Sequence, residues 1–194
     1  MTTPSIKGTA FASAVADLQD FLDRGRLTRE QLEVRLRKED LNLIDGKILP
    51  GDWYPIDSYG RILELLGSVA GGGPSYHLQR GRRTAERLFG SGIYKQFDRA
   101  AEKRGKTDSA ALVSIMLTVG RTLYNFGSWE IVRDGSGGRR LRFELRQMEA
   151  LPENARITIQ GFVEWAAEHI VGGGVRVDSR RTHPDRIQFD ITTQ

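Results

Sequence analysis

Apolar residues recur every three to four positions through most of the first 126 residues, a spacing that places them on one face of an α-helix. Thr28 and Gln31 match a capping box and predict the start of one of these helices. Pro55 suits the first turn of another helix, because that position needs no backbone donor. The predicted helices cover residues 11–24, the segment after Thr28, 55–66, one or two helices within 75–104, and 109–125.

After Gly127 the period of the pattern shortens to two residues. Leu141, Phe143 and Leu145 alternate with charged residues, as in a strand with one buried and one solvated face. A glycine-rich stretch between two such runs indicates a β-hairpin turn. The predicted order is a hairpin within 128–148, a long helix that ends near Gly172, and strands near 174–179 and 186–192.

Strands joined by short turns favour an antiparallel sheet over a doubly wound parallel one. We therefore predict an α+β fold in which a helical N-terminal part packs on an antiparallel sheet of about four strands. The 194 residues are enough for one core, so we expect a single domain over 1–194. Its helical part covers about 8–126, and the sheet with the long helix covers about 127–194.

Composition excludes several classes of protein. The chain has no cysteine, which rules out disulfides, cysteine nucleophiles and thiolate metal sites, and which fits a reducing cytoplasm. No run of about 18 apolar residues is present, so we expect no membrane span. Asp17 and Asp20 interrupt the first apolar segment, which therefore reads as a surface helix and not as a signal peptide.

The motifs that would carry catalysis are missing. The glycine-rich stretch at 71–74 lacks the lysine and hydroxyl residue of a phosphate-binding loop and follows a predicted helix. His77, His169 and His183 do not have metal-ligand spacing, and no serine occupies a nucleophile elbow. We expect no catalytic residues, no metal site and no cofactor, and we interpret the chain as non-enzymatic.

Three basic pieces suggest an alternative function. They are "RGRR" at 80–83, "GGRR" at 137–140 and "DSRR" at 178–181, and only folding could gather them. The net charge of +4 comes from 29 basic and 25 acidic residues, so a mixed, solvated surface is the simpler reading. Arginine-mediated binding of nucleic acid or nucleotide stays open as the alternative.

Several segments in a fixed order carry a resemblance to a known family: "SIKGTAF", "LPGDWYPIDSYGRILELL", "RGRRTAERLF", "LYNFGSWEIV" and "ITIQGFVEWAAEHIVGGGVRV". Over roughly residues 5 to 192 the chain resembles a family of paralogous myxobacterial proteins related to haem-NO-binding, vinyl-reductase-type and TRAPP-subunit domains. The resemblance implies an α+β fold with either an apolar pocket between helices and sheet or a surface for dimerisation.

The chain departs from the ligand-specific members of that group. Vinyl-reductase-type domains often close with zinc-binding cysteines, whereas residues 175–191 here contain none. Haem-binding members pair a proximal histidine with a Tyr-x-Ser-x-Arg signature, which this sequence lacks. These departures therefore disfavour both a zinc site and a haem site.

Aromatic residues are the candidates for a pocket, although packing in the core is the alternative reading of each. Large aromatic side chains bury much apolar area while their N–H and O–H groups still need partners. The candidate pocket residues are Trp53, Tyr54, Tyr59, Phe126, Trp129, Phe162 and Trp165. The leading hypothesis is a cytoplasmic, regulatory domain that encloses a small hydrophobic molecule or binds a protein partner, and we expect a homodimer.

Overall fold

The computed structural model describes residues 2–90, 109–132, 140–172 and 174–193. The hairpin tip predicted at 135–138 and the end of the predicted helical segment, 91–104, lie outside the described residues. None of the helices in the described ranges has both the length and the apolar composition needed to cross a bilayer.

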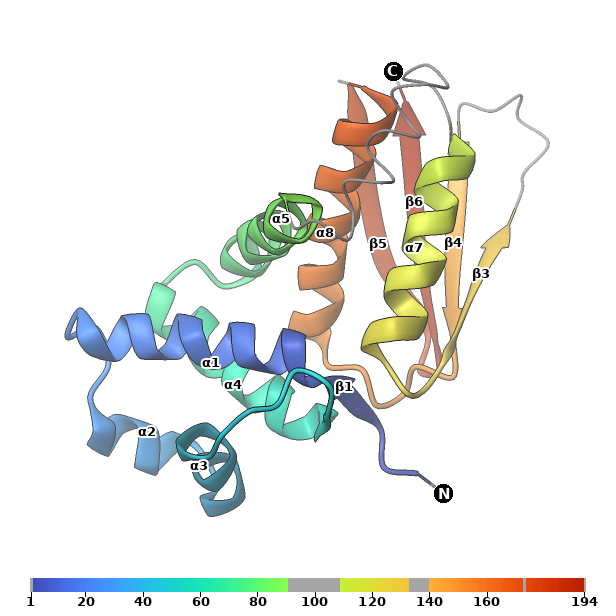
Figure 1. The fold of residues 1–194 in the computed structure, drawn as a ribbon. Helices are drawn as coiled ribbons and strands as arrows, with labels where there is room; N and C mark the ends of the chain where they lie inside the picture. Colours follow the sequence, from blue (N-terminus) through green and yellow to red (C-terminus); the bar gives the residue numbers. More distant parts are fainter. Residues whose placement is uncertain (1, 91–108, 133–139, 173, 194) are drawn as a thin grey trace.

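The N-terminal half is mainly helical (Figure 1). Thr28 forms the predicted capping box with Gln31, and Pro55 stands immediately before the helix that begins at Ile56. Two short strands, which the sequence pattern did not predict, pair antiparallel with Ile6 opposite Tyr54. The elements are β1 (Ser5–Lys7), α1 (Gly8–Asp23), α2 (Arg29–Arg35), α3 (Lys38–Asp45), β2 (Trp53–Pro55), α4 (Ile56–Ala70) and α5 (Pro74–Gly90).

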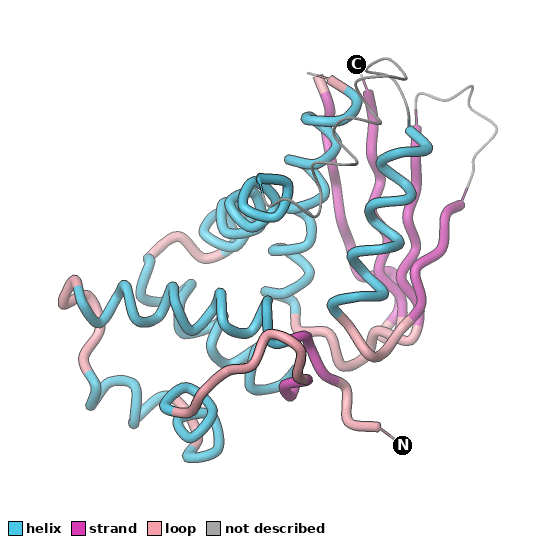
Figure 2. Tube along the Cα trace, in the orientation of Figure 1, coloured by secondary structure: helices cyan, strands magenta, loops and turns pink. Residues whose placement is uncertain are grey.

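The C-terminal half contains a four-stranded antiparallel sheet in the order β3-β4-β6-β5. Its elements are α7 (Ser109–Leu123), β3 (Ser128–Val132), β4 (Arg140–Arg146), α8 (Glu153–Val171), β5 (Val175–His183) and β6 (Arg186–Thr193). The predicted α+β fold is confirmed, with helices packed on an antiparallel sheet of four strands. In Figure 2 the long strands lie together on one side, and α1 to α4 lie on the other.

The two faces of the sheet differ in chemistry, as the alternating pattern predicts. Phe143 lies opposite Phe189 on the apolar face, which α7 and α8 cover (Figure 1). The other face carries ion pairs, such as Arg142 Nε to Asp190 Oδ1 at 2.7 Å. Arg146 Nε lies 3.2 Å from Glu130 Oε2 on the same face.

Helices α5 and α8 approach each other so closely that only glycine fits at their crossing. A Cβ atom at Gly81 would lie 2.0 Å from the carbonyl oxygen of Thr158, and one at Gly161 would lie 2.0 Å from the carbonyl oxygen of Leu78. Real atoms cannot approach that closely. The two glycines therefore fix α5 directly on the backbone of α8.

The start of the chain ties the helical part to the sheet part. The backbone N–H of Ser5 donates to Asn125 Oδ1 at 2.7 Å, and Ile6 of β1 forms a β-bridge with Tyr124 at the end of α7. Ile6 is buried, and it belongs to one hydrophobic cluster that extends from Phe11 in α1 to Phe189 in β6. The site described next lies beside this junction.

Candidate functional site

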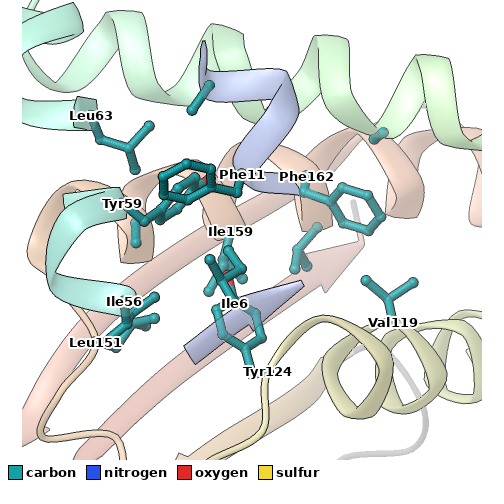
Figure 3. Close-up of a cluster of buried hydrophobic side chains, with 14 of the residues drawn as sticks. Ile6, Phe11, Ile56, Tyr59, Leu63, Val119, Tyr124, Leu151, Ile159 and Phe162 are labelled. Carbon is teal, nitrogen blue, oxygen red and sulfur yellow. The ribbon is translucent and has the colours of Figure 1, made fainter. Parts of the chain in front are cut away.

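A cavity of about 50 Å³ lies where α1, α4, α5, α7 and α8 meet. Figure 3 shows three aromatic rings gathered around Ile6 and Ile159. They belong to Tyr59 of α4, to Tyr124, which follows α7, and to Phe162 of α8. Most of the wall is apolar. Its polar groups belong to Tyr59, Tyr124, Trp129 and Arg80 and to the three aliphatic hydroxyl residues Ser13, Thr84 and Thr158. The lining residues are Ile6, Ala10, Ser13, Tyr59, Arg80, Thr84, Met116, Val119, Leu123, Tyr124, Trp129, Thr158, Ile159, Phe162 and Val163.

Arg80 supplies the charge in the wall of this cavity. Its side chain is 1% exposed, and its Nε–H donates to Asp17 Oδ2 at 2.8 Å. Its Nη1 donates to the hydroxyl of Tyr59 at 3.2 Å, and its Nη2 lies 3.5 Å from Ser13 Oγ. Burial alone would lower the pKa of Arg80, but Tyr59 and Asp17 raise it overall, so the guanidinium stays charged. Arg80 therefore joins α5 to α1 and α4.

Tyr124 places a neutral hydroxyl in the same region. Burial raises the pKa of Tyr124 well above its usual range, and the nearby charge of Arg80 opposes this only in part. The ring lies nearly parallel to Trp129, with 6.5 Å between centroids. Tyr124 therefore remains a phenol at any physiological pH.

Trp129 closes the side of the cavity next to α7. The indole lies against Gly120, where a Cβ atom would be 2.5 Å from the Nε1 atom. The side chain is 8% exposed, and the Nε1–H has no hydrogen-bond partner among the described residues. A buried N–H without a partner is uncommon and calls for an explanation.

Three of the seven candidate pocket residues come together at this cavity: Tyr59, Trp129 and Phe162 line it. Trp165 does not line it; its half-buried ring stacks on His169 with 4.7 Å between centroids. Phe126 is also half-buried, with its ring 5.7 Å from that of Tyr124. Both rings therefore pack beside the cavity wall and not within it.

The two aromatic residues of β2 do not line the cavity either. Trp53 is 42% exposed, and Lys7 Nζ lies 4.1 Å from the centroid of its ring. Tyr54 is buried, stacks on Phe11 at 4.7 Å, and accepts a hydrogen bond from the backbone N–H of Leu49. Tyr54 therefore anchors the loop before α4 and neither residue lines the cavity.

Sequence reasoning missed Arg80, which was grouped with the basic piece at 80–83. The buried side of α5 follows the spacing His77, Gly81, Ala85 and Phe89, and Arg80 lies three residues after His77 on that same side. That helical register was the signal that could have separated Arg80 from its exposed neighbours.

The basic pieces do not form one free cationic face among the described residues. Arg80 is buried, and Arg82 pairs with Glu164 at 2.9 Å and with Glu168 at 2.6 Å. Arg181 donates to backbone carbonyl groups, including that of Leu151. The donors of these three arginines are thus engaged within the protein.

A wider depression of about 920 Å³ lies between α4 and the starts of α5 and α8. It is open to solvent, and Arg61, Glu64 and Glu153 mix charges of both signs along it. Such a surface does not enclose an apolar molecule. Within the described ranges, no cluster of three or more His, Cys, Asp or Glu side chains can hold a metal ion.

No protein-family model matches the chain, and no curated protein matches it. The fold is similar to solved H-NOX structures. Fe(II) unliganded H-NOX protein from K. algicida has a TM-score of 0.61 and 12% identity, with 97% of this chain and 96% of that chain covered. A mutant of T. Tengcongensis H-NOX has a TM-score of 0.59 and 13% identity, with 96% of each chain covered. The chain therefore has an H-NOX-like fold.

H-NOX structures are described with haem, so we tested whether the described residues fit that group. A porphyrin is far larger than the cavity of about 50 Å³, and no histidine lines that cavity. Haem iron also needs an axial ligand such as histidine or a tyrosine phenolate. The tyrosines that line the cavity, Tyr59 and Tyr124, border a space too small for a porphyrin. The described residues do not fit haem.

The histidines lie elsewhere. The ring of His77 packs against Gly67 of α4, where a Cβ atom would be 2.6 Å from Nε2. His169 stacks on Trp165, and His183 lies on the surface beside Asp185. None of these three residues lines the cavity.

Proposed function

We propose that this chain is a non-enzymatic binding domain that encloses a small, mainly apolar molecule in the cavity between α1, α4, α5, α7 and α8. The observation that carries the proposal is a small, mainly apolar cavity lined by buried side chains of the core. Protein interiors are close-packed, and voids larger than a water molecule are few in a domain. A space kept open beside Arg80, Tyr59 and Trp129 is typical of a binding site with a few orienting polar groups.

The size of the cavity limits the ligand. One water molecule occupies roughly 10–15 Å³ of such a cavity. A cavity of about 50 Å³ therefore accommodates a molecule of a few non-hydrogen atoms. An acyl chain or a flat polycyclic molecule requires more space than this.

Xenon binding tests the proposal, because xenon enters apolar cavities without needing a polar contact. We expect xenon to shift the NMR signals of Val119, Val163 and Phe162 saturably. The Val163→Leu variant adds one methylene group at a cavity-lining residue and should abolish this binding while keeping the protein folded. Val34→Leu is the matched control, since Val34 is 85% exposed. Absence of saturable shifts in the unmodified protein would contradict the proposed function.

The regulatory role and the expected homodimer are parts of the same proposal that need their own measurement. Among the described residues, the large hydrophobic side chains that remain exposed are Val34, Leu49 and Trp53. Most of the apolar residues of α4 lie in the core. Sedimentation equilibrium over a wide concentration range tests the dimer, and a single monomeric species throughout would contradict it.

A further inference from the structure

The cavity wall holds hydrogen-bond donors that the protein leaves unused. The Trp129 Nε1–H is buried and has no partner among the described residues. A guanidinium group has five N–H donors, and Arg80 makes three hydrogen bonds. Two of its N–H hydrogens are therefore left without a partner in the described part of the chain.

The two threonine hydroxyls of the wall are already engaged. The Thr84 hydroxyl donates to the carbonyl of Arg80, and the Thr158 hydroxyl donates to the carbonyl of Asn154, one turn earlier in the same helix. Trp129 and Arg80 thus hold donors that these hydroxyl groups do not share. A buried donor without a partner is unfavourable, and an acceptor brought by a ligand relieves that cost.

The ion pair of Arg80 and Asp17 favours a neutral hydrogen-bond acceptor over an anionic one. The Arg80 guanidinium is already paired with the Asp17 carboxylate at 2.8 Å. An anionic ligand would add a second negative charge to a pair that is balanced, and burying an uncompensated charge is costly. A neutral acceptor meets the donors without that cost.

We propose that the ligand is a small neutral carbonyl compound, whose oxygen accepts a hydrogen bond from the Trp129 Nε1–H and whose apolar remainder fills the cavity. This inference rests on the proposed function, because it names the chemical class of the molecule that the cavity encloses. Short ketones, aldehydes and amides of a few non-hydrogen atoms belong to this class and match the volume of about 50 Å³.

Acetone and isobutene form a matched pair of probes, because they share a shape and differ in one oxygen atom. In the unmodified protein, acetone should shift the Trp129 indole N–H signal downfield, and isobutene should leave it nearly unchanged. The signal is assigned with the Trp129→Phe variant. If saturating acetone does not move the Trp129 N–H signal, the carbonyl inference is overturned.

The same variant provides a second readout. Trp129→Phe should weaken acetone binding roughly 5- to 100-fold, because the carbonyl oxygen then loses its buried partner. Isobutene binding should change less than about twofold, because it makes no hydrogen bond. Equal weakening of both probes would overturn the carbonyl inference and leave the proposed function intact. If neither probe nor xenon binds the unmodified protein, the proposed function falls as well.

Discussion

Arg80 of α5 and Asp17 of α1 form an ion pair of 2.8 Å whose cationic member is 1% exposed. A buried charge that loses its partner destabilises a fold strongly, because it stays desolvated without compensation. Asp17→Asn should therefore lower the free energy of unfolding by about 3 kcal/mol, measured by urea denaturation.

Asp20→Asn is the matched control for that experiment. Asp20 lies one turn further along α1 and also pairs with an arginine, Arg24, but both side chains are well exposed. Its replacement should cost less than about 1 kcal/mol. Equal losses of unfolding free energy in the two variants would contradict a large contribution of the buried Arg80–Asp17 pair to stability.

The crossing of α5 and α8 predicts a large effect for one methyl group. Gly81→Ala would place a Cβ atom 2.0 Å from the Thr158 carbonyl oxygen, so the helices would have to separate. Overpacking of this kind typically costs about 1–3 kcal/mol and more where backbone must move. Gly90→Ala at the end of the same helix meets nothing within 4 Å and should be close to neutral. Thermal unfolding of both variants checks the contrast, and similar transition temperatures would contradict the close packing.

His77 predicts a dependence of stability on pH. Burial, with a contribution from the charge of Arg80, lowers the pKa of His77 from 6.5 to about 4. The unfolded chain therefore takes up a proton near pH 6.5, whereas the folded chain does so only near pH 4. Stability should be greatest above pH 6.5 and should fall as the pH drops toward 4, by about 3 kcal/mol in all.

His77→Gln isolates this contribution from that of the carboxylates. The difference in unfolding free energy between the unmodified protein and this variant should change between pH 7 and pH 4.5. His183→Gln, at an exposed position, should keep the dependence that His77 causes. A constant difference for His77→Gln across that range would show that His77 is not held neutral by its surroundings.

Haem binding can be tested directly on the purified chain. The small cavity and the absence of a histidine in its wall predict no stoichiometric complex when haemin is added. The K. algicida H-NOX protein, with which this chain shares the fold, is the positive control. A saturable Soret band at one haem per chain would contradict the conclusion that the described residues do not fit haem.

The fold was largely predictable from the sequence, because its pattern changes period at a definite place. Alternation around Phe143 marks the apolar face of the sheet, and the capping box at Thr28 marks a helix start. Both are local signals that neighbouring residues determine. The pairing of β1 with β2 was not predictable, because three-residue strands are too short to show a period.

The cavity was predictable only in part. Tyr59, Trp129 and Phe162 were candidates because large aromatic residues line many interiors, but the sequence has no signal for which aromatics share one space. Trp53 and Tyr54 are adjacent in the chain, yet one is 42% exposed and the other is buried, because neighbours in a strand face opposite ways. Arg80 escaped notice because arginine is rarely buried, and only its partners from α1 and α4 make that burial tolerable.

The glycine contact between α5 and α8 has a mechanical consequence. Those two helices share one rigid wall, whereas α7, which closes the opposite wall, is fastened at its end through Tyr124 and Asn125 to β1. The spacing of α5 and α8 can therefore change only if backbone moves against backbone, because no flexible side chain lies between them at the two glycines.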